Sequence, residues 1–143
     1  MRVATGSDHA GFRLKGLLAE RLAERGHEVV DLGTHSEDRV DYPDFGAAVG
    51  RAVAAGEADL GVCVCGSGIG IAMAANKVSG VRAAVVHDSV SAALARQHND
   101  ANVVCFGQRL IDDGIALGAL DAFLDASFEG GRHVGRVAKL DAL

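Results

Sequence analysis

The sequence predicts an α/β fold: a Rossmann-like three-layer sandwich in which helices cover both faces of a five-stranded parallel sheet. Five apolar runs rich in β-branched residues alternate along the chain with segments of helical periodicity. Such alternation is typical of right-handed βαβ crossovers, which make neighbouring strands parallel. The 143 residues suffice for one core, and no linker or repeat divides them. We therefore expect a single domain over 1–143.

The predicted strands are short runs that cover 2–6, 27–33, 59–66, 81–87 and 102–107. The first predicted helix begins near Phe12 and ends at Gly26, and the second opens at Pro43 and ends at Gly56. Further helices are predicted over 71–77, 89–97 and 113–126. The last residues, 129–143, form a short tail. Since a glycine pair at its start lets the chain turn sharply, we expect this tail to reach a partner subunit.

Composition excludes several classes of function. The formal net charge is -5 and no block of Lys or Arg occurs, which argues against a nucleic-acid partner. No continuous apolar stretch is long enough to cross a membrane, and the first residues lack the layout of a signal peptide. We expect a cytoplasmic protein with no membrane partner.

Three cysteines, Cys63, Cys65 and Cys105, form an odd set. We expect the side chains of Cys63 and Cys65 to point to opposite faces of one strand, and a disulfide framework is not predicted. The spacing of a CxxC metal site is also missing. We expect no metal.

The segment "CGSGIG" (65–70) joins a predicted strand to a predicted helix. Backbone N–H groups in such a turn favour an anion. The glycine spacing does not match GxGxxG, and no Walker lysine follows, which disfavours a nucleotide. The same amides, with the hydroxyl of Ser67, could instead hold an oxyanion. Cys65, at the helix amino end, is either an active base or nucleophile, or only a small packed residue.

Other residues allow both a functional and a plain interpretation. His98 lies in a polar cluster at a connection, where an imidazole could move protons or simply be solvated. Asp8 could cap a helix as well as contact substrate, whereas His9 has no such structural explanation. Arg132 and Arg136 are four residues apart, so on a helix they could grip a dianion together or form a solvated face.

Taken together, "GSDHAGFRLK", "DYPD", "CGSGIGIAMAANK", "GVRAAVVHD", "RQHNDANVVCFGQR" and "EGGRHVGRV" resemble the family of ribose-5-phosphate isomerase type B and galactose-6-phosphate isomerase. The resemblance covers practically the whole chain in order. It implies a homodimer, or a tetramer made of two such dimers, whose active sites are each built from two subunits. It also implies that no metal or organic cofactor is needed.

The resemblance implies catalytic roles for four residues. Cys65 matches the base that takes the proton from C2 of the sugar, and His98 matches the residue that helps to open the furanose ring, with Asp8 near the same hydroxyls. Ser67 belongs to the anion hole for the enediolate, whose backbone amides are those of Gly66, Gly68, Ile69 and Gly70.

The resemblance also implies how substrate is bound. Asn99 matches a contact to a sugar hydroxyl, and Tyr42 lies in a loop that borders the sugar. The phosphate would be held by four residues, some from the other subunit: His9, Arg109, Arg132 and Arg136. The sequence resembles the branch that uses the cysteine, because Ile71 stands where the other branch has a glutamate. Ser67 departs from the threonine of many such members but keeps the hydroxyl.

The predicted function is therefore an aldose–ketose isomerase, with ribose 5-phosphate and ribulose 5-phosphate as the first-choice substrate pair. Isomerisation of allose, galactose or tetrose phosphates is the alternative within the family. A nucleotide-binding regulatory module is the alternative from another class. A non-catalytic subunit is disfavoured because both Cys65 and His98 are present.

Overall fold

The computed structural model describes all 143 residues and contains one parallel sheet of five strands. The strands are β1 (Arg2–Ser7), β2 (Glu28–Asp31), β3 (Leu60–Cys65), β4 (Ala83–Val85) and β5 (Val103–Gly107). Their spatial order is β2-β1-β3-β5-β4, and every neighbouring pair is parallel. The chain leaves β1 toward one edge of the sheet and returns to its other side for β3. This arrangement makes a topological switch point between β1 and β3, where open α/β sheets bind ligands.

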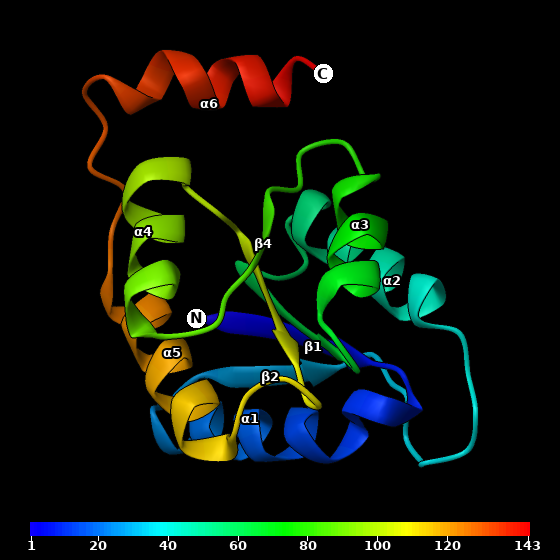
Figure 1. Ribbon diagram of the computed structural model, residues 1–143. Coiled ribbons are helices and arrows are strands. Elements are labelled where there is room, and N and C mark those ends of the chain that lie inside the picture. Colours follow the sequence, from blue (N-terminus) through cyan, green and yellow to red (C-terminus); the bar gives the residue numbers. More distant parts are fainter.

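Helices cover both faces of the sheet, so the three-layer prediction is confirmed. The helical elements are the 3₁₀ turn η1 (His9–Gly11) and the helices α1 (Phe12–Glu24), α2 (Tyr42–Ala54), α3 (Ile69–Asn76), α4 (Ser89–Asn99), α5 (Asp113–Asp125) and α6 (His133–Asp141). Helices α1, α4 and α5 pack on one face, and α2 and α3 pack on the other. Figure 1 shows these layers, with α6 standing apart beyond α4. No helix is long and apolar enough to cross a membrane.

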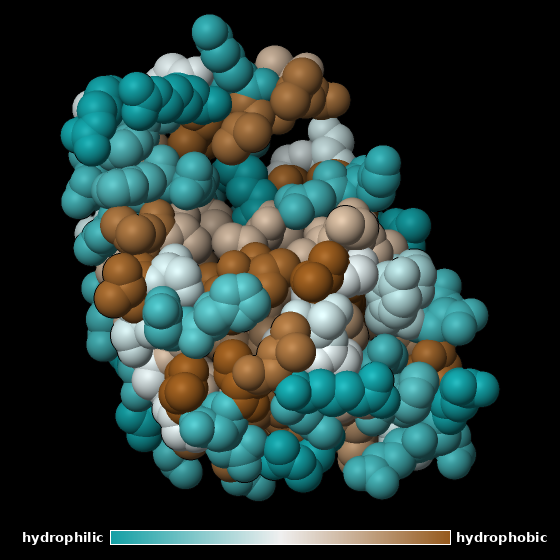
Figure 2. Space-filling model, viewed as in Figure 1, coloured by the Kyte–Doolittle hydropathy of each residue, from teal (hydrophilic) through white to brown (hydrophobic).

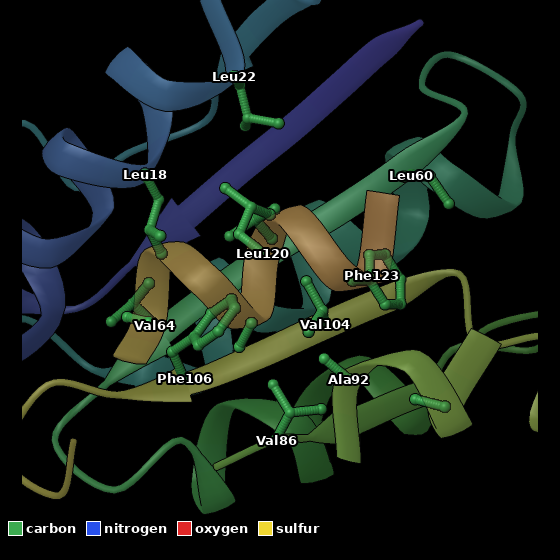
Figure 3. Close-up of a cluster of buried hydrophobic side chains, with 14 of the residues drawn as sticks. Leu18, Leu22, Leu60, Val64, Val86, Ala92, Val104, Phe106, Leu120 and Phe123 are labelled. Carbon is green, nitrogen blue, oxygen red and sulfur yellow. The ribbon is translucent and has the colours of Figure 1, made fainter. Parts of the chain in front are cut away.

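The larger core lies beneath α1, α4 and α5. Figure 3 shows Leu18 and Leu22 of α1 with Leu120 and Phe123 of α5 above the strand residue Val104, and all five are at most 1 % exposed. Burying such side chains is worth about 1.5–3 kcal/mol each and fixes the sheet against its helices. The site therefore rests on a rigid platform.

The two cysteines of β3 lie on the same face of the sheet, so the expectation of opposite faces is wrong. Side chains alternate along a strand, and residues two apart therefore share a face. Cys63 and Cys65 both belong to the core under α2 and α3, and Cys105 stands beside Cys63 in the register of β3 and β5. All three thiols are free.

The tail forms a helix rather than an irregular segment. Gly130 and Gly131 both have positive φ, and α6 follows them. Arg82 ties α6 to the body through a 2.9 Å ion pair with Asp141. A second connection runs to α4, through the imidazole rings of His98 and His133. The tail therefore packs in part on its own domain.

Candidate active site

A cavity of about 560 Å³ opens at the carboxyl edge of the sheet, at the switch point between β1 and β3. Because residues that follow parallel strands meet at one edge, this is where the sequence placed its candidates. The cavity gathers most of them. Its lining consists of Asp8, His9, Ala10, Tyr42, Cys65, Gly66, Ser67, Ile69, Gly70, Met73, Arg109 and Leu110.

Cys65 is the last residue of β3, and its thiol lies at the floor of the cavity with 4 % of the residue exposed. The N–H of Gly68 donates a hydrogen bond to its Sγ at 3.1 Å. Gly68 caps α3 with a φ of 79°, a conformation that glycine adopts at little cost. A donor at the amino end of a helix stabilises negative charge on sulfur. The conformation of the turn thus directs a backbone N–H group at the sulfur of Cys65.

Backbone N–H groups beside the thiol are free to bind an anion. Those of Gly66, Ser67 and Gly70 donate no hydrogen bond within the chain, as is usual at the start of a helix. The N–H of Ile69 is instead taken by the hydroxyl of Ser67, at 3.2 Å. The cavity thus combines a sulfur with unpaired donors, which is the arrangement that a developing oxyanion needs.

A reagent for thiols should distinguish Cys65 from the other two cysteines. Cys63 and Cys105 are fully buried, and a hydrogen bond with Cys63 together with burial raises the pKa of Cys105 well above its ordinary value. We expect iodoacetamide to modify one thiol per native chain and three after unfolding, as counted by mass spectrometry. Cys65→Ser should reduce the native count to zero. Modification of Cys63 or Cys105 in the folded protein would contradict this assignment.

Asp8 and His9 follow β1 and face the cavity from its other side. Asp8 is 6 % exposed, and its carboxylate accepts the N–H of Gly11 at 3.1 Å, so the predicted capping role is confirmed. Nδ1 of His9 lies 3.2 Å from both the backbone nitrogen and the carbonyl oxygen of Val40. The loop holds this ring nitrogen in either tautomer, which leaves Nε2 for a ligand.

Tyr42 and Arg109 form the sides of the cavity. Tyr42 is the first residue of α2 and not part of a loop, and its ring occupies the space that a side chain at Gly70 would need, with 2.5 Å to the missing Cβ. The guanidinium of Arg109 lies over Gly66 in the same way. Arg109 makes no ion pair within the chain, so its charge is available to an anion.

Five predicted site residues do not line this cavity: Gly68, His98, Asn99, Arg132 and Arg136. Gly68 lies beside it, and its N–H is taken by the Sγ of Cys65. In a βαβ unit the helix runs antiparallel to the strands, so the last turn of α4 lies at the amino edge of the sheet. The nine residue steps from Ser89 carry His98 about 14 Å away from the carboxyl edge. Both arginines lie in the tail next to it, exposed and without an ion pair. Asn99 lines a separate hollow of about 500 Å³ beneath α6, which Figure 2 shows.

Lys15 is a residue of the site's surroundings that the sequence reasoning missed. It is 2 % exposed, and its ammonium contacts the carboxylate of Asp31 at 2.7 Å and the carbonyl of Thr34 at 2.5 Å. These contacts anchor the loop that carries Val40 to His9. The sequence contains a sign that Lys15 is buried, because it shares the helical face of Leu18 and Leu22 at the spacing i, i+3, i+7.

A parallel sheet whose switch-point cavity combines a thiol, a carboxylate, an imidazole, a free arginine and unpaired amides defines a site for acid–base chemistry on a small anionic molecule. The family model described as Ribose/Galactose Isomerase matches residues 3–140. The chain belongs to this family.

Similar proteins agree with this assignment over nearly the whole chain. Ribose-5-phosphate isomerase B of Escherichia coli (strain K12) is 49 % identical over 142 residues, 99 % of this chain and 95 % of that protein. The structure of ribose-5-phosphate isomerase B from Clostridium thermocellum has a TM-score of 0.98 at 49 % identity and covers 99 % of this chain and 96 % of its own. The Mycoplasma genitalium enzyme with bound ribulose-5-phosphate has a TM-score of 0.95 at 44 % identity, with 99 % and 94 % covered.

Proposed function

We propose that this chain is an aldose–ketose isomerase that interconverts D-ribose 5-phosphate and D-ribulose 5-phosphate. The observation that carries the proposal is that the Cys65 sulfur and backbone N–H groups without a hydrogen-bond partner lie together in one cavity. Similarity to ribose-5-phosphate isomerases B over the full length supports the choice of sugar.

The proposed chemistry is a proton transfer between two adjacent carbons. The thiolate of Cys65 takes the proton from C2 of the open-chain aldose, and the electron pair moves through C1 to the carbonyl oxygen. The amides of Gly66, Ser67 and Gly70 receive the negative charge of the resulting cis-enediolate. The thiol returns its proton to C1, the hydroxyl proton of O2 moves to O1, and the carbonyl forms at C2. These steps need no redox carrier, and we expect no cofactor or metal.

We propose that each site is completed by a second copy of the chain. His98 and the two tail arginines lie at the edge of the sheet opposite their own Cys65, so one chain cannot use both sets together. A homodimer in which the last turn of α4 and the start of α6 face the partner's cavity would unite them. His98 would then open the furanose ring with Asp8, and Asn99 would contact a hydroxyl.

Exposed apolar side chains support this association. Ile69, Met73 and Leu110 line the cavity and are 47 %, 63 % and 58 % exposed. Val90 and Leu94 expose an apolar stripe on α4. Surfaces of this kind mark interaction sites in proteins of this size. We expect a dimer, or a tetramer made of two such dimers. The three free thiols of each chain fit the cytoplasm.

Charge removal in the tail should weaken binding rather than chemistry. The phosphate lies away from the reacting carbons, so Arg132 and Arg136 should bind it equally in the ground and transition states. We expect Arg132→Gln and Arg136→Gln each to raise KM about tenfold while kcat stays within about threefold. Lys139→Gln, in the same helix, is the matched control and should change neither constant. A fall in kcat at constant KM would contradict the phosphate role.

The test of the proposed function is a panel of sugar phosphates. We would compare kcat/KM for the isomerisation of ribose 5-phosphate, allose 6-phosphate, galactose 6-phosphate and erythrulose 4-phosphate. Ribose 5-phosphate should have the highest value. A higher value for another sugar would reassign the substrate within the family. No turnover of any sugar, combined with thermal stabilisation by a nucleotide, would support the regulatory module instead.

A further inference from the structure

Two histidines form a stack where the tail meets the body. His98, on the last turn of α4, and His133, the first residue of α6, have ring centroids 4.4 Å apart and planes inclined by 15°. The carboxylate of Glu129 lies 3.5 Å from Nε2 of His98 and 3.8 Å from Nε2 of His133. None of these three side chains lines the cavity around Cys65. Glu129 and His133 have no role in the chemistry described so far.

His133 is buried between α6 and the end of α4 and does not lie at the surface. It is 5 % exposed, and its buried Nε2 has no hydrogen-bond partner. Burial lowers the pKa of His133, and the charges of Arg132, His98 and Arg136 act in the same direction, while Glu129 opposes them. The lowered pKa favours the uncharged ring of His133, which can lie against His98 without charge repulsion.

Glu129 is held at the end of α4 by the backbone. Its N–H donates to the carbonyl of Gln97 at 3.0 Å, next to His98 in the chain. The side chain is half exposed. A carboxylate at this distance restrains which way the ring of His98 faces and lies where it can stabilise charge that develops on that ring during a reaction.

We propose that Glu129 and His133 are positioning residues for His98 in sugar ring opening. This inference rests on the proposed role of His98. In that step His98 takes the proton of the anomeric hydroxyl, the bond between C1 and the ring oxygen breaks, and the ring oxygen receives the proton. His98 is an imidazolium between the two transfers. Glu129 stabilises that charge, and the neutral ring of His133 holds the imidazole flat against α6.

A metal site is the competing interpretation of the same three side chains, whose ligand atoms lie within 4.8 Å of one another. The lone pair of an imidazole nitrogen lies in the plane of its ring. Two nearly parallel stacked rings therefore cannot both direct a lone pair at one ion. The geometry therefore favours a role in positioning His98 over a role in binding a metal.

The test compares a sugar that must be opened with one that is always open. Ribose 5-phosphate forms a furanose, whereas the phosphate on O4 of erythrose 4-phosphate prevents ring closure. We expect His133→Ala and Glu129→Gln to lower kcat/KM for ribose 5-phosphate about tenfold or more and to leave that for erythrose 4-phosphate within about twofold. His133→Phe keeps a stacked ring and should lose less than about threefold.

Asp141→Asn is the matched control, because it weakens the attachment of α6 without touching the histidines, and it should retain both activities. The inhibition constant of acyclic 4-phospho-D-erythronate gives a second readout and should be unchanged in all variants. Equal losses for both sugars, a weaker inhibitor, or unchanged ribose 5-phosphate turnover in His133→Ala and Glu129→Gln would overturn the inference. So would stoichiometric Zn²⁺ binding that these variants abolish. Failure of the wild-type enzyme on every sugar would instead refute the proposed function.

Discussion

Cys65→Ala is expected to lower kcat for ribose 5-phosphate by about a thousandfold, because removal of a general base costs 10²–10⁴ in rate. Binding should survive, since the phosphate ligands and the amides of the turn remain. We would measure kcat in a coupled assay and the Kd of 4-phospho-D-erythronate by calorimetry. The Kd should stay within about threefold of the wild-type value.

Cys63→Ala is the matched control for that experiment. Its thiol lies on the same face of β3 but is fully buried and lines no cavity. This variant should lose some stability, of the order of 1 kcal/mol, and keep its kcat within about threefold. If Cys65→Ala retained a tenth of the wild-type kcat, another group would have to be the base.

Mixing two inactive variants should restore activity if each site is shared. Cys65→Ala and His98→Asn are each expected to be nearly inactive as homodimers. In a hybrid dimer one site receives both substitutions, and the other site receives none. Random exchange makes about half of the dimers hybrid, so about a quarter of the wild-type activity should appear.

The measurement requires subunits to exchange, for example by refolding the two variants together. The control mixes Cys65→Ala with the double variant Cys65→Ala/His98→Asn, which cannot form an intact site in any combination. Activity restored in the first mixture alone would support shared sites. Failure of the first mixture, with hybrid dimers detected by native mass spectrometry, would refute them.

The layers of the fold could be predicted from the sequence because alternation of strand and helix dictates a parallel sheet. The central strands β1, β3 and β5 lie close to their predicted ranges. The edge strands are shorter: β2 covers 28–31 of the predicted 27–33, and β4 covers 83–85 of the predicted 81–87. An edge strand is paired on one side only, so fewer of its residues stay in the ladder. Hydropathy does not reveal which strands are edges.

The site residues at the carboxyl ends of strands could be predicted from the sequence. The positions of residues at the end of α4 and in loops were harder to predict. Cys65 is the last residue of β3, and Asp8, His9 and Arg109 come soon after β1 and β5, so the topology brings them together. The position of His98 relative to Cys65 also follows from the direction of α4, but it depends on topology, and the residue types alone do not reveal it. Contacts such as the ammonium of Lys15 with the Thr34 carbonyl depend on loop conformation, which periodicity does not encode.

The close contact between the Tyr42 ring and Gly70 limits how this enzyme could acquire new substrates. Any side chain at position 70 would displace the ring, because the missing Cβ lies 2.5 Å from it. On the side of the cavity that Tyr42 forms, room for a longer sugar can therefore arise only by replacing Tyr42 with a smaller residue. Descendants with altered specificity should carry a smaller residue at position 42 and still a glycine at position 70.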